Sequence, residues 1–106
     1  MNIIKASELN TGYTRQDVIE HMCAKVMGQI QRASTQGYRQ TNFHGGCWRW
    51  DKEKQKIVYP YECDGPYFDW DNYKDEVKQV FIANGYKIKP TGYIGGVWQH
   101  TETIMW

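Results

Sequence analysis

The residues best suited to chemistry are a histidine and a cysteine three positions apart, in His44-Gly-Gly-Cys47. Together with Cys63 and His100, they form a Cys2His2 set of the kind that binds zinc tetrahedrally. Zinc modules normally contain two closely spaced ligand pairs, whereas this chain has one. Packing cysteines and surface histidines are therefore the simpler interpretation. We predict no metal ion and no cofactor.

The same pair suggests a second chemistry, a thiolate activated by a neighbouring base. Neighbouring positions on an extended strand often point away from each other, however, and Gly45-Gly46 is more typical of a bulge or a tight bend. A second glycine-rich stretch, residues 92–96, does not open a helix, so it lacks the backbone donors of a phosphate site. We therefore predict that the protein is not an enzyme.

The most informative segment spans residues 48–73, where aromatic rings alternate first with lysines and then with carboxylates. The chain has five Trp, eight Tyr and three Phe, more rings than we expect so small a core to bury. Exposed Trp and Tyr act as anchors in protein interfaces, and charge steers the encounter. We predict a partner-binding surface made of Trp48, Trp50, Tyr61, Tyr67, Phe68 and Trp70, with Asp64, Asp69 and Asp71 facing basic groups of the partner.

Two other interpretations of this segment stay open. The rings could instead roof a sheet, with the charges solvated around them. Alternatively, rings flanked by cations could stack single-stranded bases or a nucleotide. That module would use Arg39, Arg49, Lys52, Lys54 and Lys56 with Trp48 and Trp50. The carboxylates of residues 59–76 argue against it, because they would repel phosphates.

The elements that must position these residues begin with a long helix. Ile19, Met22, Val26, Ile30 and Ala33 form an apolar stripe with helical spacing, which predicts a helix over residues 14–36. Thr14 and Asp17 resemble a capping box at its start, and Gly37 is placed to end it. A strand over 38–43, a hairpin with arms 47–50 and 57–61, and a loop over 62–69 should follow.

The C-terminal half should contain a second helix and two strands. The helix begins at Asp69 or Asp71 and ends at Asn84-Gly85. A strand over 86–89 ends at Pro90, a turn covers 91–96, and a last strand covers 97–106. This order predicts a single α+β domain over residues 1–106: two helices packed on a small antiparallel sheet, with residues 44–68 as an inserted aromatic hairpin and loop.

Composition points to the cytoplasm. Three cysteines without framework spacing suit a reducing compartment. The first residues do not resemble a signal peptide, and no stretch approaches the roughly 20 apolar residues of a membrane span. The net charge of +1 gives no overall basic footprint for nucleic acid.

The closing pattern supplies a resemblance. A helix that ends in Ala83-Asn-Gly-Tyr86, a glycine-rich turn and a terminal Thr103-Ile-Met-Trp106 resemble small uncharacterised proteins of bacteriophage genomes. The similarity covers residues 14–43 and 69–106, and it carries no functional residues over. It implies an accessory protein, located in the cytoplasm of a bacterial host, that binds and inhibits a host protein or ribonucleoprotein complex. Anti-CRISPR proteins act on defence complexes in this way.

Overall fold

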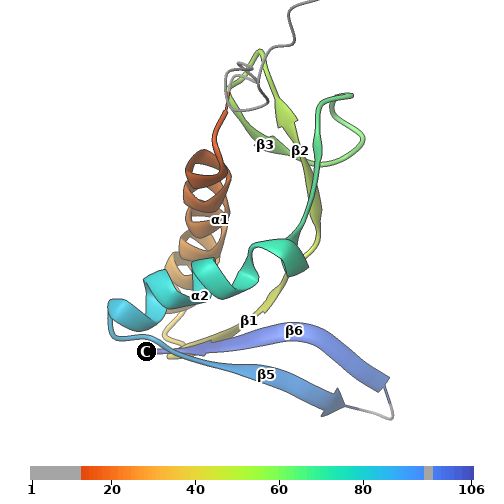
Figure 1. Cartoon of the computed structure of the whole chain (residues 1–106). Helices are drawn as coiled ribbons and strands as arrows, with labels where there is room; N and C mark the ends of the chain where they lie inside the picture. The colour runs from red at the N-terminus through yellow and green to blue at the C-terminus, as the bar shows by residue number, and fades with distance from the viewer. Residues whose placement is uncertain (1–12, 95–96) are drawn as a thin grey trace, which may run out of the picture.

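The computed structural model describes the backbone of residues 13–94 and 97–106, and the side chains of 13–90 and 101–106. Two helices and two antiparallel sheets of three strands each make up an α+β fold, as predicted (Figure 1). Sheet A has the strand order β1-β6-β5, and sheet B has the order β3-β2-β4. The elements are α1 (Arg15–Thr35), β1 (Gln40–His44), β2 (Cys47–Asp51), β3 (Lys56–Val58), β4 (Tyr67–Asp69), the 3-10 helix η2 (Trp70–Asn72), α2 (Lys74–Ala83), β5 (Lys87–Ile94) and β6 (Val97–Met105).

Helix α1 forms as its sequence predicts. The Thr14 side chain accepts a hydrogen bond from the Asp17 amide, and the Asp17 carboxylate accepts one from the Thr14 amide, which completes a capping box. Gly37 has a φ of 87°, a conformation open to glycine just past a helix end. Figure 1 shows α1 running from sheet B to sheet A, so its buried stripe packs against both sheets.

Sheet A is formed by β1 and the C-terminal hairpin. Phe43 and Glu102 pair across β1 and β6, and Pro90 of β5 lies opposite Glu102 on the other side. The predicted end of the strand at Pro90 is wrong, because β5 continues to Ile94. Strand β5 is an edge strand, where a proline without an N–H is tolerated. Positions 95–96 of the predicted turn lie outside the described residues.

Sheet B is built from the predicted insert, which pairs with a segment predicted as loop. Strand β2 lies in the centre, and its Trp48 pairs with Phe68 of β4, while Trp50 pairs with Ile57 of β3. Residues 67–69 therefore form a strand and not a loop. They hydrogen-bond with the free side of β2, and a pairing between segments so far apart cannot be read from the local sequence. The hairpin's second arm ends at Val58, before Pro60.

One hydrophobic core joins the two sheets and the two helices. The Phe43 ring of sheet A lies 5.1 Å from the Trp70 ring, which follows sheet B. The Asp69 carboxylate caps η2 by accepting from the Asp71 amide at 3.1 Å. At the helix surfaces, Arg15 Nη2 lies 2.5 Å from Glu76 Oε1 and so links α1 to α2.

Candidate functional site

Four of the six predicted aromatic anchors are core residues. The exposed fractions are 5% for Trp48, 3% for Trp50, 6% for Phe68 and 6% for Trp70. The prediction that these four rings are exposed is wrong, because all four pack in the shared core of the two sheets and the helices. Side chains this deeply buried cannot act as anchors on a partner's surface while the domain stays folded.

Ring-to-ring packing explains how the interior holds so many large side chains. Trp48 and Trp70 meet edge to face with centroids 6.4 Å apart, and Phe68 meets Tyr73 in the same geometry at 5.8 Å. Tyr13 contacts both Trp50 and Phe68. Aromatic pairs prefer such tilted contacts and gain about 0.5–1.5 kcal/mol beyond their burial. The rings therefore fill the core as one mutually packed cluster.

Among the described side chains the exposed rings are tyrosines, and three of them lie on one segment. Tyr61 is 84% exposed, while Tyr59 and Tyr67 are each 54% exposed. We call this segment, residues 59–67, the tyrosine loop. The Tyr59 and Tyr61 rings stack at 5.7 Å with their planes 5° apart. Tyr59 was not among the predicted anchors. The sequence signal that could have identified it is its position two residues before Tyr61, on the other side of Pro60.

Hydrogen bonds hold the tyrosine loop in one conformation against sheet B. The Glu62 amide donates to the Tyr59 carbonyl at 3.0 Å, and the Tyr59 amide donates to Glu62 Oε2 at 2.7 Å. Further along, Arg49 Nη1 donates to the Gly65 carbonyl at 2.8 Å, and the Trp50 amide donates to Pro66 at 2.9 Å. A loop fixed in this way loses little conformational entropy on binding.

The outer face of sheet B brings Cys47, Arg49 and Tyr67 together. The Arg49 guanidinium lies 5.6 Å from the centre of the Tyr67 ring. A hydrogen bond with Cys47 and, after it, burial raise the pKa of the Tyr67 hydroxyl. Tyr67 lies diagonally across from Cys47 on β4, since the residues paired directly are Cys47 with Asp69 and Arg49 with Tyr67.

The three predicted carboxylates have different surroundings. Asp64 is exposed within the tyrosine loop. Asp69 is half-buried and caps η2, so its charge is engaged within the fold. Asp71 is exposed and lies 3.4 Å from Lys74 Nζ. Of the three, Asp64 alone stands among the exposed tyrosines.

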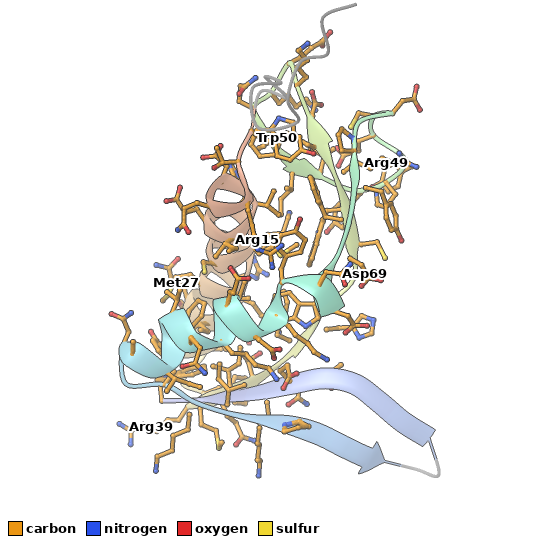
Figure 2. The ribbon with its side chains drawn as sticks, in the orientation of Figure 1. Arg15, Met27, Arg39, Arg49, Trp50 and Asp69 are labelled. Carbon is orange, nitrogen blue, oxygen red and sulfur yellow. The ribbon has the colours of Figure 1, made fainter. Side chains whose placement is uncertain are left out.

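The cations of the alternative nucleic-acid module do not form one surface. Figure 2 shows Arg39 by sheet A and Arg49 on sheet B, at opposite ends of the molecule. Lys52 and Lys54 lie in the β2–β3 turn, and Lys56 begins β3. Because Trp48 and Trp50 are buried, these cations have no predicted base-stacking platform beside them.

Among the side chains described, no three of His, Cys, Asp and Glu gather as metal ligands would. The His100 side chain of the predicted zinc set lies outside those described. Neither of the described helices is long and apolar enough to cross a membrane. Comparison of the chain with protein-family models, curated proteins and solved structures finds no match.

Proposed function

We propose that the protein is a non-enzymatic binding domain whose partner is a protein with a basic surface, held through the tyrosine loop. The observation that carries the proposal is the stacked pair of Tyr59 and Tyr61 on a hydrogen-bonded loop, with Tyr61 84% exposed. Rigid tyrosines supply contact area at low entropic cost and are enriched at energetically important interface positions.

Charge defines the kind of partner. The tyrosine loop contains Glu62 and Asp64 and no lysine or arginine. Arg49, behind the loop, donates to the Gly65 carbonyl, so its charge is turned toward the loop backbone. Exposed carboxylates beside exposed rings favour a surface rich in Lys and Arg, because complementary charge speeds encounter and suppresses wrong partners.

The resemblance to bacteriophage accessory proteins supplies the biological setting of the proposal. In that setting the partner is a host protein or ribonucleoprotein complex in the bacterial cytoplasm, such as a defence complex, and binding inhibits it. A ribonucleoprotein offers basic protein surfaces of the required kind, since these neutralise its RNA.

The test is affinity capture from a bacterial lysate with the purified domain as bait. Replacing Tyr61 by Ala and Asp64 by Lys removes one exposed ring and reverses one charge. We expect recovery of the captured complex to fall about tenfold or more, because an interface anchor is typically worth 2 kcal/mol or more. Thermal unfolding should be nearly unchanged, because both side chains are exposed.

A matched control changes the same chemistry elsewhere: Tyr38→Ala with Glu53→Lys. Tyr38 is 61% exposed and precedes β1, and Glu53 is exposed in the β2–β3 turn. This control should capture the complex as the wild type does. Equal recovery by all three proteins, or equal loss in both variants, would show that the tyrosine loop is not the binding surface.

A further inference from the structure

A cavity of about 520 Å³ lies between α1 and the link from β1 to β2. Its volume falls within the roughly 300–1,000 Å³ of small-molecule sites. Helix α1 contributes Lys25, Gly28, Gln29 and Arg32, and the opposite wall includes residues 43–48. Tyr59 also lines the cavity, and Lys25 Nζ lies 5.5 Å from the centre of its ring.

The charged side chains that line this cavity are all basic. Lys25, Arg32 and His44 line it, and no carboxylate does. None of these three side chains forms an ion pair with another described residue. Burial lowers the pKa of Lys25, and the nearby Lys56 lowers it further, while Glu62 opposes both. The positive charge of Lys25 is thus only partly balanced by its surroundings in the cavity.

Gly28 leaves room between the two helix cations. Lys25 and Arg32 are seven residues apart, which places them on one side of α1 with about 10 Å of helix between them. Gly28 lies between them, and a Cβ added there would approach one atom within 4 Å, Arg32 Nη1 at 3.8 Å. No neighbouring element therefore requires a glycine at this position of the helix. Its missing side chain keeps the cavity floor open.

We infer that this cavity binds a phosphate-bearing small molecule of nucleotide size, with Lys25 and Arg32 on its phosphates. Arginine binds phosphate oxygens through paired N–H groups, and lysine contributes a point charge. The side-chain amide of Gln29 is engaged by Thr41 and the Asn42 carbonyl, so it stiffens the wall instead of facing the ligand. A cavity of this size suits a small molecule better than a nucleic-acid strand, which needs a continuous row of cations and stacking rings.

Calorimetry with adenosine diphosphate and with inorganic phosphate tests the inference. We expect saturable binding of the diphosphate to the wild type, and weaker binding of phosphate alone. The double variant Lys25→Met, Arg32→Met should weaken diphosphate binding about tenfold or more, because each hydrogen bond to a charged group is lost with its charge. The pKa of Lys25, followed by NMR at its ε-carbon, should rise when phosphate binds.

Two controls locate the site. Arg39→Met with Lys54→Met also removes two cations but lies outside the cavity, so binding should change less than about twofold. Gly28→Gln keeps both cations and fills the floor, so binding should be lost. The inference fails if the wild type shows no saturable binding, if the outer pair weakens binding equally, or if Gly28→Gln binds normally. It also fails if a single-stranded oligonucleotide binds and the diphosphate does not displace it.

Discussion

At the scale of single residues, adjacent glycines have opposite surroundings. A Cβ added to Gly45 would lie 2.1 Å from Cδ1 of the buried Trp70, whereas one added to Gly46 would meet nothing within 4 Å. Sequence shows two equivalent glycines between β1 and β2. The structure shows that Gly45 is needed for close packing and that Gly46 is not.

Gly45→Ala should therefore destabilise the domain by about 1–3 kcal/mol, the usual cost of overpacking a core. Gly46→Ala, its neighbour, should change stability by no more than about 0.5 kcal/mol. Guanidinium unfolding followed by tryptophan fluorescence measures both. Similar losses in the two variants would contradict the close contact between Gly45 and Trp70.

At the scale of elements, a largely buried ion pair attaches α2 to sheet A. Lys78 Nζ lies 2.8 Å from Glu102 Oε1, and the two side chains are 21% and 11% exposed. The second carboxylate oxygen of Glu102 has no hydrogen-bond partner among the described residues. The pair therefore leaves a buried carboxylate dependent on one lysine.

Lys78→Met should destabilise the domain by about 3 kcal/mol, because it leaves the buried charge of Glu102 uncompensated. The double variant Lys78→Met, Glu102→Met removes both charges and should recover most of that loss, since an apolar pair of similar size can replace a buried ion pair. Urea unfolding of the wild type and both variants decides this. A double variant no more stable than the single one would contradict the electrostatic explanation.

At the scale of the whole molecule, Trp70 connects two sheets that share no strand. It contacts Phe43 of sheet A and Trp48 of sheet B within one core. The Phe43 and Trp70 rings bridge the space between sheets that Figure 1 shows at different ends of α1. The two sheets should therefore unfold together.

Trp70→Ala should cost about 3–5 kcal/mol, as expected for a buried aromatic residue, and both sheets should lose structure in one transition. Tyr61→Ala removes an exposed ring instead and should change stability by no more than about 0.5 kcal/mol. Hydrogen exchange of amides in β2 and β6 measures each sheet separately. Persistent protection of one sheet after loss of the other would contradict a shared core.

Helix α1 could be predicted from the sequence because everything that forms it is local. Its stripe repeats every three or four residues, its capping box joins Thr14 to Asp17, and Gly37 follows its end. The hairpin of β2 and β3 was predictable for the same reason. Strand β4 was not, because it pairs with β2 across the intervening residues 52–66, which include β3.

The sequence predicted which segment carries the candidate site, but not which of its aromatic residues are exposed. The sequence gives the number of aromatic residues and shows in which segment most of them lie. Which ring is buried depends on what covers each face of a strand, and that is decided by α1 and the second sheet. Sequence alone therefore determined the helices, the α+β class and the aromatic segment. Tertiary packing decided that its tryptophans stabilise the core and that Tyr59, Tyr61 and Tyr67 meet the solvent.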